Sequence, residues 1–243
     1  MVDLEEQCPL CRGRGLLVRG DTAVPCACAG RGRGPGSLPP RLALCTLDRF
    51  SLGYYARDRK DPDRGTSYYE LARVARTAAE QFIQDFPGRS RVDGLLFTGG
   101  VGSGKTFLAG AVANALLAGG ARVSFIVVPD LLDMLRASYD APRDQGWAAQ
   151  GLWDAARETP LLILDDLGAH NYTEWTLNRL YSLVNYRFNH LLPLVVTTNI
   201  SLEDMQGYLG ERTTSRLIQM CRIYRLLVET DIRLLVGTQA ARS

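Results

Sequence analysis

Lysine is scarce in this chain, because Lys60 and Lys105 are the only lysines among 28 lysine and arginine residues. Arginine therefore supplies almost every positive charge, which makes the position of Lys105 informative. It lies in the segment TGGVGSGKT, where a compact ammonium on a thin stem fits and a planar guanidinium is bulky. We interpret Lys105 as a candidate phosphate contact.

Long apolar runs are also missing: none approaches the length of a bilayer span, and no early apolar run indicates a signal peptide. We therefore expect a cytoplasmic protein without a membrane partner, in which thiols stay reduced. The net charge of +2 selects no class of partner. The two histidines, His170 and His190, are isolated and are not expected to be ligands, and Cys45 and Cys221 are expected to be buried thiols.

Cysteines cluster at the N-terminus as two pairs, Cys8-x2-Cys11 and Cys26-x-Cys28. Four thiolates can complete a tetrahedral Zn²⁺ site, and C-x2-C is a common half of one. The surrounding residues are rich in glycine and proline and too few to bury a core, so a metal would supply their stability. The alternative is a disordered tail with unliganded thiols. We predict a zinc-binding module over residues 1–40.

After Pro87 the pattern of strands and helices alternates, which predicts a doubly wound α/β sheet with a parallel core. Short apolar runs predict strands at 94–97, 122–127, 161–164, 194–197 and 224–228. Helices are expected to begin near residues 105, 129, 146, 173, 201 and 211. A further helix is expected over 67–86, after a charged stretch that reads as part of a linker.

The segment 99–106 matches the phosphate-binding pattern G-x-x-x-x-G-K-[ST], with an apolar strand before it and a helical segment after it. Glycines let the backbone N–H groups face phosphate oxygens, and the helix N-terminus adds partial positive charge. The alternative, a glycine-rich turn without a ligand, is disfavoured by this setting. The residues expected to hold ATP are Gly99, Gly100, Val101, Gly102, Ser103, Gly104, Lys105 and Thr106.

Two carboxylates, Asp165 and Asp166, follow the apolar run LLIL at the predicted end of a strand. Ligands of open parallel sheets bind at that edge. We expect Thr106 and Asp165 to hold Mg²⁺, and Asp166 to orient or deprotonate the attacking water. The alternative is that the two aspartates cap the next segment.

Further polar side chains follow the predicted strand VVTT and precede the last strand. Asn199 is placed to position water or sense the γ-phosphate, or else to cap the helix after it, a role for which Ser201 competes. Arg212 and Arg216 share one face of a helix. They could reach the nucleotide of a neighbouring subunit, or else form surface salt bridges with Glu211 or Asp204.

Taken together, GLLFTGGVGSGKTFLAGAVANAL, LLILDDLGAH, VVTTN and ERTTSRL resemble the DnaC/DnaI-type helicase loaders of the AAA+ ATPases, including those of phages. The resemblance runs from the N-terminal cysteines to about Arg233. It implies an AAA+ P-loop NTPase fold with a five-stranded parallel sheet over 67–243, after a linker over 41–66. It also implies that Asn199 is sensor 1 and that Arg216, with Arg212 as the fallback, is the arginine finger.

The resemblance further implies ATP hydrolysis between self-associated subunits, and delivery or opening of a ring-shaped replicative helicase on single-stranded DNA. Asp166 departs from the family, because many AAA+ proteins have the longer Glu there, so slow hydrolysis or a non-hydrolysing switch stays open. Residue 170 also departs, since His170 stands where relatives often have Glu. Arg233 is the nearest candidate for a C-terminal arginine that faces the nucleotide.

Two other functions are compatible with a phosphate-binding loop. An ATP-dependent regulator of a transposase (IstB-like) would share the ATPase fold and bind DNA, but the cysteine module favours the loader. A small-molecule kinase needs a lid and a substrate pocket, and the sequence offers no segment for either.

Overall fold

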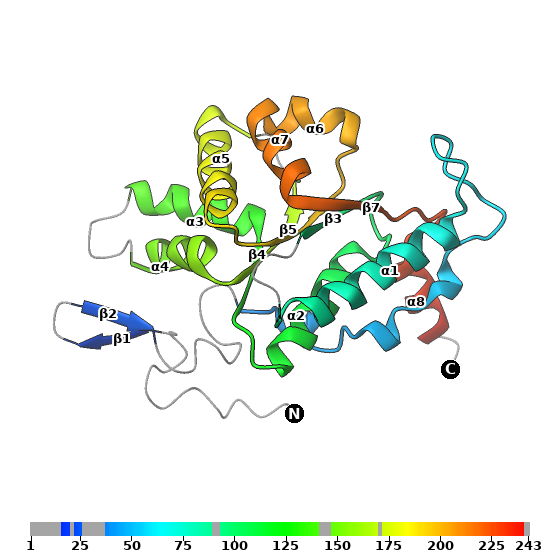
Figure 1. The fold of residues 1–243 in the computed structure, drawn as a ribbon, viewed down its shortest axis with the longest axis horizontal. Coiled ribbons are helices and arrows are strands. Elements are labelled where there is room, and N and C mark those ends of the chain that lie inside the picture. The colour runs from blue at the N-terminus through cyan, green and yellow to red at the C-terminus, as the bar shows by residue number, and fades with distance from the viewer. Residues whose placement is uncertain are drawn as a thin grey trace.

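The computed structural model describes residues 16–19, 22–25, 37–88, 93–140, 147–169 and 172–240. Within these residues a five-stranded parallel sheet has the order β4–β5–β6–β3–β7 (Figure 1). Its strands are β3 (Gly94–Thr98), β4 (Val123–Val127), β5 (Leu161–Leu167), β6 (Leu194–Thr198) and β7 (Cys221–Arg225). The five-stranded parallel sheet predicted from the apolar runs is confirmed.

Helices cover both faces of this sheet, with α1, α2 and α8 on one side and α3 to α7 on the other (Figure 1). Most begin within two residues of the expected positions, but the sequence did not predict α8. The helices are α1 (Tyr68–Asp85), α2 (Lys105–Ala118), α3 (Val128–Asp140), α4 (Trp147–Glu158), α5 (Glu174–Asn189), α6 (Leu202–Leu209), α7 (Glu211–Met220) and α8 (Ile232–Ala240).

The last strand was placed wrongly, at 224–228, whereas β7 spans Cys221–Arg225. The strand begins directly after α7, and its register pairs Cys221 with Gly94 of β3. Because β7 lies at the edge of the sheet, its first residues can be polar, and exposed Arg222 pairs with Asp93 at 3.1 Å. The apolar run therefore missed the first three residues of the strand and extended three residues, Leu226 to Val228, beyond its end.

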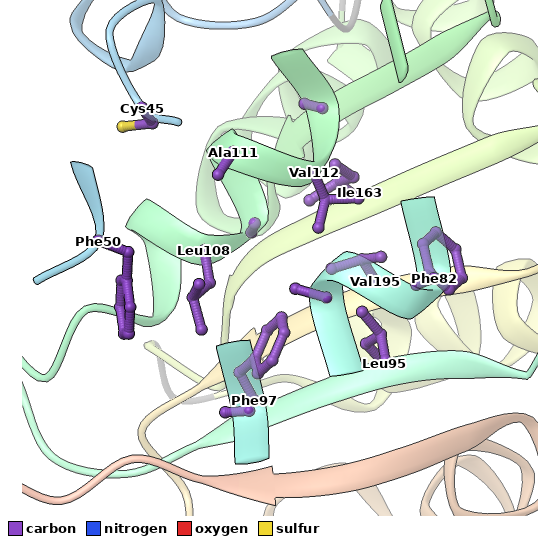
Figure 2. Close-up of a cluster of buried hydrophobic side chains, with 14 of the residues drawn as sticks. Cys45, Phe50, Phe82, Leu95, Phe97, Leu108, Ala111, Val112, Ile163 and Val195 are labelled. Atoms are coloured by element: carbon purple, nitrogen blue, oxygen red, sulfur yellow. The ribbon is translucent and has the colours of Figure 1, made fainter. Parts of the chain in front are cut away.

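Successive side chains along a strand point to opposite faces of the sheet and pack into two separate apolar cores. Leu95 and Phe97 pack against the α1–α2 layer, while Leu96 between them packs against the opposite layer. Figure 2 shows the first core, in which Phe97 and Val195 of the sheet lie near Leu108 and Val112 of α2. Burial on both faces explains why the strands read as continuous apolar runs.

The segment 41–66, expected as a linker, contributes buried side chains to the fold. Leu42, Phe50 and Tyr55 are buried in the α1–α2 core. The buried Asp61 carboxylate accepts two hydrogen bonds of 3.1 Å from Arg225 at the end of β7. Three short 3-10 helices lie in this region: η1 (Pro40–Leu42), η2 (Leu47–Arg49) and η3 (Leu52–Tyr54). The proposed domain boundaries at residues 40 and 66 stay predictions.

Near the N-terminus the structure describes a two-stranded antiparallel hairpin of β1 (Leu16–Arg19) and β2 (Thr22–Pro25). The predicted zinc ligands Cys8, Cys11, Cys26 and Cys28 lie outside the described residues, as does His170. No helix in the described part of the chain is both long and apolar enough to cross a bilayer.

Arg187 of α5 is completely buried and fixes the beginnings of two strands. Its guanidinium donates hydrogen bonds of 2.8–3.3 Å to five carbonyls, those of Ala156, Arg157, Thr159, Pro160 and Pro193. Four of these carbonyls lead into β5 and the fifth leads into β6. The side chain therefore holds the entries of β5 and β6 together.

Replacing Arg187 with methionine should lower the free energy of unfolding by roughly 3–5 kcal/mol, because several partly buried carbonyls lose their donor. Urea titration followed by circular dichroism measures this change. The matched control is Arg179→Met, since Arg179 lies over the rings of Trp153 and Trp175 and should cost only about 1 kcal/mol. Equal losses in the two variants would contradict the role given to Arg187.

Candidate nucleotide and magnesium site

The loop between β3 and α2 has the backbone of a phosphate-binding loop. Gly102 and Gly104 have φ values of 71° and 90°, a region that residues with a Cβ rarely adopt. Gly104 directly precedes α2, so the first amides of that helix open toward the loop. The loop is braced internally by Ser103, whose hydroxyl donates to the Gly100 carbonyl at 2.8 Å.

Lys105 lies folded against this loop. Its ammonium donates to the carbonyls of Gly99 at 2.8 Å and Gly100 at 2.6 Å. Burial lowers the pKa of Lys105 to about 8, although the nearby carboxylates of Asp166 and Asp165 act in the opposite direction. An incoming phosphate group would offer this ammonium a stronger partner than the two carbonyls.

Thr106 and Asp165 meet as the sequence predicted. The Thr106 hydroxyl donates to Oδ1 of Asp165 at 2.8 Å, and the Thr197 hydroxyl donates to the same oxygen at 2.7 Å. Burial raises the pKa of the Asp165 carboxyl, while these two hydrogen bonds lower it. A hydroxyl and a carboxylate oxygen side by side at the end of a phosphate loop are the donor set that Mg²⁺ takes in such sites, so these residues fit the ion.

A β-bulge turns Asp166 away from the ladder. The register pairs Leu164 with Val196 and Leu167 with Thr198, so that Asp165 and Asp166 together face Thr197. Asp166 has a φ of 62°, and its N–H donates to the Thr197 hydroxyl at 2.9 Å. Bulges re-aim side chains next to active sites, and here the bulge presents two consecutive carboxylates at one edge of the sheet.

Asn199 lies beside Asp166, and its side-chain amide donates to Oδ1 of Asp166 at 3.3 Å. The capping alternative is wrong, because Ser201 is the N-cap of α6 and accepts from the N–H of Asp204 at 3.1 Å. Asn199 also lines a cavity of about 190 Å³ together with Gly99. This side chain therefore lies beside the Asp166 carboxylate, and its role as sensor 1 stays a prediction.

Arg212 and Arg216 lie on α7, which packs against α5, α6 and β7. The guanidinium of Arg216 lies 4.1 Å from the centre of the Phe188 ring and donates to Gln219 at 3.4 Å. Within the described residues, the structure does not bring either arginine into the group formed by Lys105 and Asp165. Their roles therefore stay predictions.

Arg233 lies near the loop but faces another partner. The N–H of Ile232, at the start of α8, donates to the Gly102 carbonyl at 3.1 Å. Arg233 pairs with Asp231 at 2.6 Å, and this pairing raises the pKa of Arg233 and lowers the pKa of Asp231. The nucleotide-facing role of Arg233 stays a prediction.

The remaining cysteines and histidines add no ligand site among the described residues, where no group of three or more His, Cys, Asp or Glu side chains could hold a metal. Cys45 and Cys221 are buried free thiols, as expected. His190 stacks on Tyr186 and its Nδ1 lies 2.8 Å from the Tyr186 carbonyl.

Sequence reasoning missed two side chains that organise the site. The Thr197 hydroxyl donates to the Asp165 carboxylate and accepts from the Asp166 N–H. The only sign of this in the sequence was a hydroxyl near the end of a predicted buried strand. Tyr55 donates a hydrogen bond of 2.8 Å to the Ser103 carbonyl from 48 residues earlier in the chain. No pattern in the sequence marked Tyr55.

Residues 69–229, well over half of the chain, match the sequence profile of the family described as IstB-like ATP binding protein. The chain is 28% identical over 143 residues to the replicative helicase loader DnaC of Escherichia coli K12, covering 59% of this chain and 56% of that protein. It is 27% identical over 162 residues to the replicative helicase loader DnaI of Bacillus subtilis, covering 66% of this chain and 48% of that protein. The chain thus spans about half the length of these curated relatives.

Solved structures show the same fold. The crystal structure of the DnaC helicase loader matches with a TM-score of 0.60 and 26% identity, covering 79% of this chain and 100% of that chain. DnaI matches with a TM-score of 0.62 and 21% identity, over 80% and 94% of the two chains. AMPPCP-bound DnaA from Aquifex aeolicus matches with a TM-score of 0.60 and 17% identity, over 84% and 56%. The expected AAA+ P-loop fold is confirmed.

The lowered pKa of Lys105 can be measured directly, because the chain has only two lysines. In protein free of nucleotide and metal, NMR of ¹³C-labelled lysine should show one resonance that titrates near pH 8. Phosphates favour the charged ammonium, so ATP affinity should fall as the pH rises past 8, where the free protein loses that charge. A Lys60→Arg variant assigns the resonance. A titration midpoint of 10.5 or above for Lys105 would contradict its buried placement.

Proposed function

Because this chain belongs to the IstB-like ATP binding protein family, we propose that it hydrolyses ATP to deliver or open a ring-shaped replicative DNA helicase on single-stranded DNA. The observation that carries the ATPase part is the 2.8 Å hydrogen bond between Thr106 and Asp165 at the end of the phosphate loop. The loader part is supported by the sequence matches to DnaC and DnaI, both named replicative helicase loaders.

The loop residues bind and orient the triphosphate. The Gly104 and Lys105 amides donate to phosphate oxygens, and the Lys105 ammonium leaves the carbonyls of Gly99 and Gly100 for the β- and γ-phosphates. Thr106 and Asp165 would hold Mg²⁺. When bound, this ion neutralises the negative charge that gathers on the phosphate oxygens.

The bulge residues handle the attacking water. The Asp166 carboxylate accepts a hydrogen bond from the water and orients it, while Asn199 fixes that carboxylate through its side-chain amide. Aspartate is one methylene shorter than the glutamate of many AAA+ proteins. We therefore expect slow hydrolysis by the isolated chain.

A neighbouring subunit completes the site. In this proposal the chains self-associate through their ATP sites, and half-buried Arg216 reaches the γ-phosphate bound by the next molecule. Its stacking on Phe188 would keep the guanidinium extended at the surface of α7. Positive charge at that position stabilises the transferring phosphoryl group.

Replacing Arg216 with alanine should leave the ATP dissociation constant within about twofold of the original value. Hydrolysis by the assembled protein should fall on the order of 10³-fold, the lower end for such arginines. Equilibrium binding of a fluorescent ATP analogue and a phosphate-release assay measure the two quantities. The matched control is Arg212→Ala, four residues earlier on the same helix. Normal hydrolysis by Arg216→Ala with loss in Arg212→Ala would transfer the role to Arg212.

The loader function is tested by assembly of a purified replicative helicase on circular single-stranded DNA, with ATP and with either the original protein or its Lys105→Ala variant. The original protein should increase the amount of DNA-bound helicase, and the variant, unable to hold ATP, should not. No effect on the helicase, together with ATP-dependent binding to duplex DNA, would favour the alternative, an IstB-like regulator of a transposase. The matching family is described as IstB-like ATP binding protein.

We further propose that Cys8, Cys11, Cys26 and Cys28 bind one Zn²⁺. The support is the β1–β2 hairpin, which lies between the two cysteine pairs in the sequence. Its register pairs Leu16 with Pro25, so the first residue of β1 lies beside the last residue of β2. Elemental analysis should find one zinc per chain, and none in a Cys8→Ser, Cys11→Ser double variant. Cys45→Ser, at a buried free thiol, is the control. A metal-free native protein purified without chelator would rule out the site.

A further inference from the structure

The segment before α1 runs along the helix that follows the phosphate loop. Asn114 of α2 donates to the carbonyls of Leu42 at 2.8 Å and Cys45 at 2.7 Å. Gly110 of the same helix allows this approach, because a Cβ there would lie 3.2 Å from the Cβ of Cys45. Figure 2 shows Cys45 and Phe50 beside α2, near Ala111 and Leu108 respectively. The segment is thus attached to α2 before it reaches the loop.

At its far end this segment places Tyr55 under the loop. The side chain is 3% exposed, and its hydroxyl donates to the Ser103 carbonyl at 2.8 Å. A Cβ on Gly104 would lie 2.7 Å from the Tyr55 oxygen, so the hydroxyl reaches the backbone only because that residue is glycine. The ring of Phe50, 5.6 Å away between centres, packs beside it.

The hydroxyl of Tyr55 is a donor to the Ser103 carbonyl, because a carbonyl oxygen can only accept. Burial raises the pKa of Tyr55 above its usual value, so the hydroxyl keeps its proton. The donor to the Ser103 carbonyl is thus a buried hydroxyl, whereas the carbonyls of Gly99 and Gly100 accept from the Lys105 ammonium.

We propose that Tyr55 is a positioning residue for the nucleotide, one that sets the direction of the Gly104 N–H through the Ser103 carbonyl. The carbonyl of Ser103 and the N–H of Gly104 belong to one planar trans peptide, in which they point in opposite directions. Holding the carbonyl on the Tyr55 side therefore directs the N–H to the other side, where the loop receives phosphate. This inference rests on the proposed ATP site.

The bond adds affinity by pre-organisation. A loop whose amides already point at the ligand loses less conformational freedom when phosphate binds. The gain in affinity should be equal for ADP and ATP, because the Gly104 amide would donate to phosphates that both nucleotides carry. Hydrolysis by the bound complex depends on Asp166 and Asn199 instead.

The test is Tyr55→Phe, which removes one oxygen and keeps the ring. Affinity for both ATP and ADP should fall about tenfold, the scale of one hydrogen bond. The turnover number at saturating ATP should stay within about twofold, so the change appears in KM. The matched control, Tyr54→Phe, removes a hydroxyl from the adjacent half-buried ring and should leave both quantities unchanged.

Thermal unfolding separates positioning from mere stability. If Tyr55 only stabilised the fold, the nucleotide-free variant would melt at a lower temperature and yet bind ATP normally once folded, and this result would overturn the inference. If the original protein fails to bind ATP, the proposed function fails; if it binds and Tyr55→Phe binds equally well, only the inference on Tyr55 fails.

Discussion

One carboxylate oxygen, Oδ1 of Asp165, joins the three parts of the site. It accepts hydrogen bonds from Thr106 at the start of α2 and from Thr197 near the end of β6, while belonging itself to β5. Two hydroxyls that converge on one buried acid fix the spacing between the phosphate loop and the edge of the sheet. Thr106 and Asp165 are thereby kept side by side, as the two residues that would hold Mg²⁺ in the proposed ATP site.

This arrangement depends on strand register, and register is controlled at both ends of β5 and β6. At their beginnings the buried Arg187 binds carbonyls that lead into each strand. At their ends the bulge opposite Thr197 inserts one additional residue and turns Asp166 out of the ladder. The strain of a positive φ at a non-glycine residue is tolerated because the Thr197 hydroxyl satisfies the displaced N–H of Asp166. The same side chain thus stabilises the bulge and orients both acids.

Much of this could be predicted from the sequence, because the relevant signals are local. Apolar runs marked strands that are buried on both faces, and the spacing of Gly99, Gly104, Lys105 and Thr106 marked the loop. The contact between Asp165 and Thr106 could be expected because parallel strands end at a common edge. In the pair Asn199 and Ser201, the structure assigns the helix cap to Ser201.

The errors and omissions arise from contacts between distant parts of the chain. Tyr55 reaches Ser103 across 48 residues, and Arg225 of β7 donates hydrogen bonds to Asp61 from 164 residues later in the chain. The start of β7 was misplaced because exposed Arg222, near the beginning of this edge strand, interrupts the apolar run. From their composition such segments look polar or irregular. Only the folded structure shows which groups elsewhere in the chain they bind through hydrogen bonds.

The central claim is that Thr106 and Asp165 form a site for magnesium and ATP, and calorimetric titration of ATP with and without Mg²⁺ tests it most directly. The original protein should bind ATP at least about tenfold more tightly when the ion is present, corresponding to about 1.4 kcal/mol. The Asp165→Asn variant should bind ATP with the same affinity in both conditions. An original protein that is insensitive to Mg²⁺, or a variant as sensitive as the original, would contradict the account.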